Sequence, residues 1–265
     1  MKAFKNKFAW WAVLILFFGG TIIQGCATTA TTDPVQEVDN KKLARKKFQE
    51  AREFGSLDMK EEMLAALHET VDLDPKNINY RLQLGYAYIR MEDFENAEMT
   101  FLQILEIDKN NKPALRELGI LSMRKRDWQK AVYYFNEDLK NPGTPMPHQI
   151  YNYLALSYYN MGKHENAEEE WLKALHVKEN AAIRLNLALA YRDRERFDDA
   201  MVSLKKALDL NPNFAQAHFE MAVLLLKKRE NKKASKHFNE VLRVSPQGPW
   251  AQSSRKYIKL MQSGL

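Results

Sequence analysis

Residues 78–111 read INYRLQLGYAYIRMEDFENAEMTFLQILEIDKNN, and this stretch decides the fold. Apolar and small side chains recur in it at the spacing of one face of a helix, without the alternation of a strand. Gly85 is followed twelve residues later by Ala97, and Phe101 comes four residues after that. Two antiparallel helices that approach closely need small residues where they cross and large apolar residues beside the crossing. The stretch therefore predicts a pair of packed helices.

The same three positions recur along most of the chain with a period near 34 residues. The first small residue of each unit is Ala51, Gly85, Gly119, Ala155, Ala188 or Ala222. The alanine that follows is Ala97, Ala131, Ala167, Ala200 or Ala234, and the large residue is Phe101, Phe135, Trp171, Leu204 or Phe238. One helical pair cannot bury its apolar face alone, so the units must stack. We expect an all-α solenoid of about six helical pairs.

This pattern resembles the tetratricopeptide repeat. The resemblance places six units at 44–77, 78–111, 112–147, 148–180, 181–214 and 215–248. The first unit is degenerate, with Met63 in place of the expected alanine and Leu67 in place of the usual aromatic residue. Residues 141–147, NPGTPMP, hold three prolines, which are not compatible with a helix interior. We expect a kink or a local hinge there.

The residues from Pro249 to Met261 are expected to form a C-terminal capping helix, within a cap of residues 249–262. Four side chains are expected to cover the last pair: Trp250, Tyr257, Ile258 and Met261. Four others are expected to face water: Ser253, Ser254, Arg255 and Lys259.

The N-terminus has the pattern of a secretory signal. Three lysines precede an apolar run from Phe8 to Phe18, which is too short to span a bilayer comfortably. The segment ends in Ile23-Gln24-Gly25-Cys26, and Cys26 is the only cysteine of the chain. This ending resembles the lipobox of bacterial lipoproteins, which implies a signal peptide over residues 1–25 and an acylated Cys26. The alternative is an uncleaved N-terminal membrane anchor.

Residues 26–40 are expected to form a lipidated, flexible tether, because they are rich in Thr and Ala and lack helical periodicity. Residues 41–265 would then form the solenoid. By resemblance to lipoproteins of Gram-negative bacteria, Ala27 after the acylated cysteine favours the outer membrane. The expected location is the periplasmic face of the outer membrane, with the chain anchored by lipid and not spanning the bilayer.

The charge of the chain is unevenly distributed. The net charge is +6, and loss of the three signal lysines would lower it to +3, so the basic composition is weak support for nucleic acid as a partner. Residues 215–265 hold ten Lys and Arg against three Glu, a net charge of +7. This basic segment fits either contact with an acidic partner or anionic headgroups, or a solvated end cap.

The sequence shows no motif of catalytic or metal-binding residues. The six histidines show no metal-ligand spacing with an acidic partner, and there is no nucleophile motif or glycine-rich phosphate loop. His164 occupies the turn position held by Phe94, Trp128 and Phe197 in other units, and His218 the position of Tyr151, so both are expected to pack. We predict a protein that is not an enzyme and has no cofactor, metal or small-molecule substrate.

By resemblance to the repeat family, a partner would bind along the first helices of the pairs. Twelve residues are expected to line this groove: Leu82, Tyr86, Ile89, Ile120, Met123, Asn152, Leu156, Tyr159, Leu185, Leu189, Phe219 and Val223. Only Arg116 and Arg192 are basic at these positions, which makes a clamp for a peptide C-terminus improbable. A mostly apolar groove suits an amphipathic helix or an extended apolar segment. The alternative is that the superhelical curvature or the tether buries part of this face.

The combination of lipoprotein signal, tether and repeats resembles the type IV pilus biogenesis and stability lipoproteins, the pilotins. This resemblance implies a protein partner, an outer-membrane secretin, whose assembly or stability the chain would assist. Two alternatives stay open: an adaptor for peptidoglycan hydrolases or synthases, and a scaffold of another envelope complex.

Overall fold

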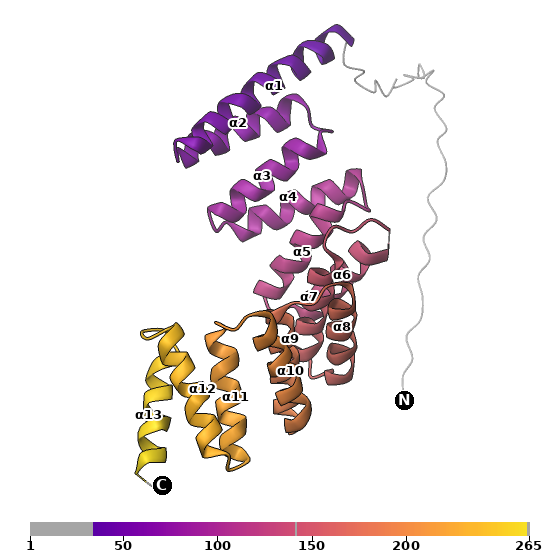
Figure 1. Cartoon of the computed structure of the whole chain (residues 1–265). Coiled ribbons are helices and arrows are strands. Elements are labelled where there is room, and N and C mark those ends of the chain that lie inside the picture. The colour runs from indigo at the N-terminus through magenta and orange to yellow at the C-terminus, as the bar shows by residue number, and fades with distance from the viewer. Residues whose placement is uncertain (1–33, 141, 264–265) are drawn as a thin grey trace, which may run out of the picture. The chain divides into compact units, whose positions relative to one another are not determined.

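The computed structural model describes residues 34–140 and 142–263, and this part of the chain is entirely helical (Figure 1). Residues 40–265 form one compact unit. The helices are α1 Pro34–Ser56, α2 Lys60–Leu73, α3 Ile78–Arg90, α4 Phe94–Ile107, α5 Lys112–Arg124, α6 Trp128–Lys140, α7 Pro147–Asn160, α8 His164–Val177, α9 Ala181–Asp193, α10 Phe197–Leu210, α11 Ala215–Lys227, α12 Asn231–Val244 and α13 Ala251–Gln262.

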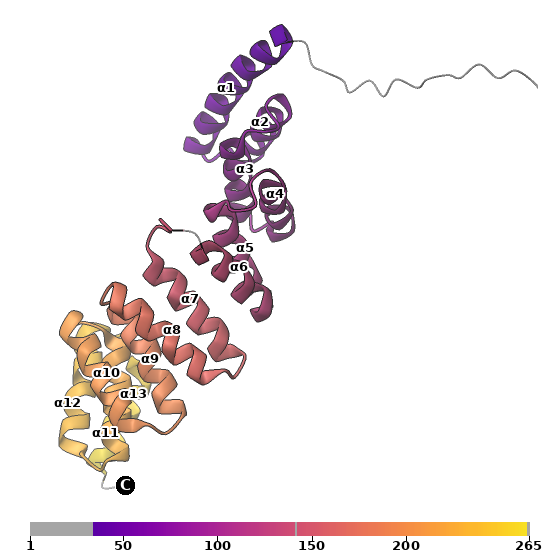
Figure 2. The same ribbon diagram turned by 90° about the vertical axis from the view of Figure 1, so that its right-hand side faces the viewer.

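From α2 onward each helix packs against the next one in sequence, so the pairs stack in chain order (Figure 2). The first helices of five pairs begin at residues 78, 112, 147, 181 and 215, within one residue of the expected unit starts. Several of these helices begin after an asparagine whose side chain accepts a hydrogen bond from the first turn, as Asn77 does from the Tyr80 amide. Such N-caps satisfy amide groups that have no partner inside the helix.

The turn inside each pair has one fixed backbone feature. The residue two positions before every second helix has a positive φ, between 56° and 74°. These residues are Asp58, Glu92, Arg126, Gly162, Glu195 and Arg229. Five of the six are not glycine, although the left-handed region disfavours side chains. The packing of the two helices therefore overrides a local preference at each turn.

The core confirms the positions that the repeat pattern predicted. The alanines of the second helices, Ala97 through Ala234, are all fully buried, and so are the large residues Phe101, Phe135 and Phe238. At Gly85 and Gly119 a Cβ atom would lie only 2.7 Å and 2.5 Å from the ring atoms of Phe101 and Phe135. The small residues are thus required by contact with the large ones, and the predicted all-α repeat fold is confirmed.

The start of α1 corrects the expected extent of the tether. Residues 34–40 are helical, and α1 begins ten residues before the expected start of the first unit at 44. Pro34 is the first residue of α1, where its missing amide hydrogen costs nothing, and Glu37 lies in the first turn, where an acidic side chain favours the helix. The signal sequence, Cys26 and the tether up to residue 33 lie outside the described residues.

Helix α13 caps the last pair largely as predicted. The Tyr257 ring stacks on Phe238 with centroids 5.1 Å apart, and Trp250 packs on Phe219 at 5.0 Å. The expectation for Ser254 was wrong, because this residue is fully buried and does not face water. Its hydroxyl donates to the Trp250 carbonyl at 2.8 Å, which satisfies the polar group inside the helix.

The proline-rich connection between α6 and α7 is tied to the fold by a polar network. The carboxylate of Asp138 is fully buried and accepts from the Arg116 guanidinium at 3.2 Å and from the Thr144 hydroxyl at 3.2 Å. Lys112 donates to the Thr144 hydroxyl at 2.6 Å. The expected break in the period is therefore present, and side chains of α5 and α6 hold the loop.

Within residues 34–140 and 142–263, none of the helices combines the length and the hydrophobicity that crossing a bilayer requires.

Candidate partner-binding groove

The twelve predicted groove residues lie on the first helices α3, α5, α7, α9 and α11, as the repeat pattern requires. Ten of them are half-buried, so part of each side chain reaches solvent. Leu82 and Leu185 are buried and contribute to the core instead. The role of these residues in binding stays a prediction.

Polar contacts orient several of these side chains. The amide oxygen of Asn152 accepts from the Trp171 indole at 2.9 Å and from the Asn186 amide at 3.1 Å. The Tyr159 hydroxyl donates to Asp193, and burial together with this hydrogen bond raises the pKa of Tyr159 to about 12. Tyr159 therefore stays protonated near neutral pH, and its ring is held in place.

The C-terminal end of this face is occupied by the chain itself. Phe219 contacts Trp250, Phe238 and Tyr257, with ring centroids 5.0 to 6.2 Å apart. This residue serves the contact with α13 as well as the surface of α11. A partner would find the more open positions on the earlier helices.

The two arginines of the predicted face are used internally. Arg116 pairs with the buried Asp138, and Arg192 pairs with Glu220, which is 7% exposed. A buried carboxylate without its cation would be costly, so neither guanidinium is free to hold a ligand. This pairing agrees with the prediction that the two residues do not form a clamp for a peptide C-terminus.

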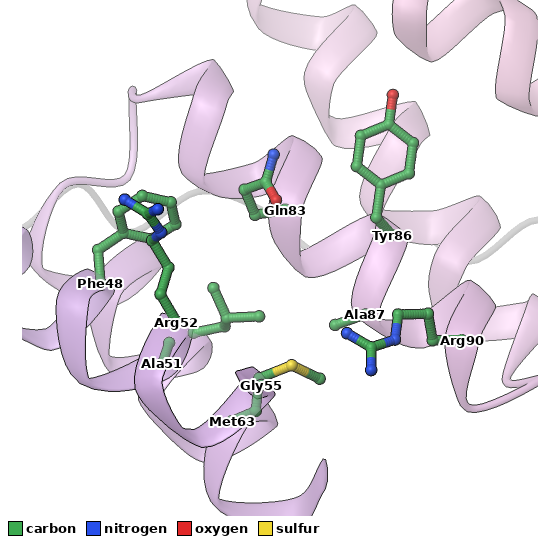
Figure 3. A pocket seen from close by; sticks show the side chains of 10 residues that line it. Phe48, Ala51, Arg52, Gly55, Met63, Gln83, Tyr86, Ala87 and Arg90 are labelled. Carbon is green, nitrogen blue, oxygen red and sulfur yellow. The ribbon is translucent and has the colours of Figure 1, made fainter. Parts of the chain in front are cut away.

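A pocket of about 230 Å³ lies between α1, α2 and α3 (Figure 3). Its lining comprises Phe48, Ala51, Arg52, Gly55, Met63, Leu67, Gln83, Tyr86, Ala87 and Arg90. Of the twelve predicted residues only Tyr86 belongs to it. Phe48, Arg52 and Gly55 were missed because the groove positions were counted from the second unit onward. The same count from residue 44 finds them, so the signal was present in the sequence.

The chemistry of the pocket combines an apolar floor with a basic rim. Ala51, Met63 and Leu67 are buried, and the Met63 thioether lies beside Gly55 (Figure 3). Arg52 and Arg90 are exposed at the rim. The nearest carboxylate oxygen recorded for Arg90 belongs to Asp58, at 3.9 Å, so the pairing is loose. The pocket therefore suits an apolar side chain that is followed by an acidic group.

Tyr86 forms one wall of this pocket. Its ring lies edge-on to Phe101 at a centroid distance of 5.8 Å. Burial, with a contribution from the Glu117 carboxylate, raises the pKa of Tyr86 above its ordinary value. The hydroxyl therefore stays protonated at neutral pH, and it points away from Ala51 and Met63 at the floor of the pocket (Figure 3).

The histidines that the sequence singled out serve packing. His164 is the first residue of α8, as Phe94, Trp128 and Phe197 are of α4, α6 and α10, and its ring contacts Tyr159. His218 is buried, and its Nε2 donates to the Pro212 carbonyl at 2.9 Å. Its Nδ1 lies 2.9 Å from Nδ1 of His237. Among the described residues, no three His, Cys, Asp or Glu side chains are arranged to hold a metal ion.

Comparison with known families identifies the repeat. Sequence models of the tetratricopeptide repeat match residues 78–111 and 152–204, and a third, described as TPR repeat, matches residues 188–229. The chain therefore contains tetratricopeptide repeats over these residues, and repeats of this kind form scaffolds for protein–protein interaction.

Curated relatives share this repeat at low identity. The Hsp70-Hsp90 organising protein of Plasmodium falciparum is 23% identical over 205 residues, which cover 77% of this chain and 29% of the relative. The anaphase-promoting complex subunit cut9 of Schizosaccharomyces pombe is 30% identical over 132 residues, which cover 50% and 16%. The chain thus spans less than a third of the length of these two relatives.

Solved structures with the same arrangement of helices cover most of the chain. The pilF protein of Pseudomonas aeruginosa has a TM-score of 0.66 at 15% identity, covering 82% of this chain and 99% of that one. PilW, a widely conserved type IV pilus biogenesis factor, has a TM-score of 0.68 at 18% identity, covering 80% and 97%. A repeat protein from Parabacteroides merdae reaches 0.68 at 19% identity. At these identities the similarity shows the fold.

Proposed function

We propose that this protein is a lipid-anchored scaffold of the outer membrane that assists the assembly or stability of a type IV pilus secretin. Cys26 would carry the lipid, and the solenoid would bind the partner from the periplasmic side. The protein performs no chemistry in this role. Its contribution is to hold one protein segment close to the membrane.

Two observations support the proposal. The structure is similar to 99% of the pilF chain and 97% of the PilW chain, so the shared fold extends over nearly the whole length of both. The N-terminal sequence adds a lipobox-like ending at Cys26.

The pocket between α1, α2 and α3 is the observation that carries the binding role. It is open, apolar at its floor and basic at its rim, and it shares helix α3 and Tyr86 with the predicted groove. A segment that places one apolar side chain in this pocket could continue along Ile89, Ile120 and Leu156. An amphipathic helix or an extended apolar strand of the partner has this pattern.

The first experiment is purification of the full chain from detergent-solubilised envelopes, followed by identification of partners by mass spectrometry. A secretin among the main partners is the expected result. Recovery of peptidoglycan hydrolases or synthases would replace the proposal by the adaptor role. Recovery of neither class would contradict both.

A pair of variants tests whether the groove face binds the secretin. Leu156→Glu with Leu189→Glu places charges on the first helices α7 and α9, and we expect loss of secretin multimers. The matched control is Leu172→Glu with Val202→Glu, which alters exposed residues of the second helices of the same units. Circular dichroism must show both variants folded. Equal multimer levels in the two variants would reject the groove as the binding face.

A second double variant leaves the core unchanged. Arg52→Glu with Arg90→Glu reverses the charge at the rim of the pocket, where both side chains are exposed. We expect weaker secretin binding without a change in stability. Full binding by this variant would show that the rim does not contact the partner.

A further inference from the structure

The last pair and the cap differ from the rest of the chain in charge. Residues 215–265 have a net charge of +7, whereas the preceding 214 residues together have a net charge of −1. Charge of one sign at this density on a folded surface creates an attractive potential for anions.

Five of these cations have a partner within the chain, and in three cases the partner is a carboxylate. Lys228 pairs with Asp198, Lys233 with Glu230, and Arg243 with Glu240. Lys227 lies over the Phe197 ring at 4.4 Å, and Arg255 donates to the Pro246 carbonyl at 2.6 Å. The remaining five cations are exposed and have no acidic partner within the described structure: Arg229, Lys232, Lys236, Lys256 and Lys259. We call these five residues the basic end.

The fold gathers these residues at one end of the last helices. Arg229 lies in the turn between α11 and α12, and Lys232 and Lys236 lie in the first two turns of α12. Helix α13 packs on α12 and runs back toward this turn (Figure 1), so its second half, with Lys259, approaches the same end, while Lys256 lies at the middle of the helix. Exposed cations from the α11–α12 turn, from α12 and from α13 are therefore carried by neighbouring parts of the last helices.

The composition of the basic end distinguishes between kinds of anionic partner. Protein interfaces have an apolar or aromatic centre and are poor in lysine. Here four of the five cations are lysines, and Leu260 is the one large apolar residue of α11, α12 and α13 with substantial exposure, at 39%. Tyr257, Ile258 and Met261 of α13 already pack against the core. The region offers charge without an apolar anchor, which suits a layer of anionic headgroups more than a protein.

We propose that the basic end docks the solenoid on an anionic membrane surface through the phosphate groups of the lipids. This contact is independent of the pocket between α1, α2 and α3 and of the identity of any protein partner. It would place the last helical pair at a bilayer as well as the N-terminus. The attraction is that of point charges to a charged surface, so it should weaken steeply with salt.

Hydrogen exchange of the full chain on vesicles tests the proposal locally. The vesicles are pure phosphatidylcholine or phosphatidylcholine with roughly a third of phosphatidylglycerol, which gives a strongly negative surface. We expect slower exchange at residues 227–236 and 255–260 on the anionic vesicles alone. The N-terminal segment, with its apolar run and three lysines, can also bind vesicles, but that contact does not protect residues 227–236 and 255–260, so the local readout separates the two contacts. The added protection should disappear at about 0.5 M salt, where charges are screened within a few Å.

Charge-matched variants distinguish the effect of the basic end from the effect of the net charge of the chain. Lys232→Glu, Lys236→Glu and Lys259→Glu together should abolish the added protection. The control carries Lys76→Glu, Lys109→Glu and Lys178→Glu, an identical change at exposed lysines of other units. Equal loss in both variants would mean that net charge acts without a defined site. Equal protection on the two vesicle types, or tighter binding to soluble polyglutamate than to the anionic vesicles, would overturn the membrane proposal, the latter in favour of an acidic protein.

Discussion

Replacing Gly119 by alanine tests whether close approach of the two helices is what the repeat requires. A Cβ atom at this position would lie 2.5 Å from Cε1 of Phe135 and 2.8 Å from both Cδ1 and Cζ. The Phe135 ring is fully buried and stacks on Tyr153 at 5.4 Å, so it has little room to retreat. To reach ordinary contact, the ring or the whole helix must move by about 1 Å.

The expected cost follows from two opposing terms. Overpacking a well-filled core costs about 1–3 kcal/mol. Alanine in place of glycine within a helix stabilises the helix by about 1 kcal/mol. Because the contact at 2.5 Å is severe, the overpacking cost should lie in the upper half of this range, about 2–3 kcal/mol. We therefore expect Gly119→Ala to lower the free energy of unfolding by about 1–2 kcal/mol, although this exchange normally stabilises a helix.

Urea unfolding of the full chain, followed by circular dichroism, measures the effect. Gly55→Ala is the control, since its Cβ would meet the flexible end of Met63 at 3.2 Å and should cost much less. The double variant Gly119→Ala with Phe135→Leu copies the natural pair Ala188 and Leu204 and should recover part of the loss. A neutral or stabilising Gly119→Ala, or equal effects at both glycines, would refute the steric argument.

Further predictions concern the turns, the buried carboxylate and the paired histidines. Glu195→Gly relieves a positive φ of 58° and should raise the thermal midpoint slightly, whereas Gly162→Ala, at 74°, should lower the free energy of unfolding by about 1 kcal/mol; calorimetry of both variants decides. Asp138→Ala leaves Arg116 without its partner and should lower the free energy of unfolding by about 1–3 kcal/mol. It should also speed proteolysis at residues 142–147. An unchanged cleavage rate would contradict the role of the network in holding this loop. Burial, and then the neighbouring His218, lowers the pKa of His237, so the folded state binds a proton less readily than the unfolded chain and stability should fall as the pH drops below about 6.5. His237→Gln should flatten this dependence in unfolding measurements between pH 5 and 7.

The repeat itself was predictable because its requirements are local and recur. The pairing of a small residue with a large one, such as Gly85 with Phe101, is a contact between two helices of one unit, and the structure confirms it. The contacts of Tyr257 and Trp250 in the cap were predictable too, because large apolar side chains at the end of a solenoid are expected to cover the last pair. Five repetitions of this spacing along the chain make the pattern easy to recognise.

The misses occurred where a residue depends on its neighbours outside the pattern. Residues 34–40 were assigned to the tether because they lack apolar periodicity, yet the helix extends from Pro34 without an apolar face in this part. Ser254 was placed on the surface by its polarity, but its hydroxyl finds a backbone acceptor one turn earlier. Hydrogen bonds within a helix allow such residues to be buried, and hydropathy alone does not reveal them.

The candidate site was only partly accessible from sequence. The count of groove positions found Tyr86 but omitted the first unit, where Phe48 and Arg52 line the pocket. The pairing of Arg116 with Asp138 depends on a buried carboxylate, and the repeat pattern does not indicate its burial. The packing of the units decides which charged side chains form ion pairs and which stay unpaired. The unpaired side chains are the ones that a partner can contact.

The turns with positive φ provide equivalent positions from which the geometry of the superhelix can be measured. The six residues from Asp58 to Arg229 are exposed, follow one another at intervals of 33 to 36 residues, and occupy the same place in every helical pair. A spin label at two of these positions would report the rise and rotation from one unit to the next without touching the core. Distances measured across the proline-rich connection, and compared with those on either side, would give the pitch of the solenoid in solution and its change when a partner binds.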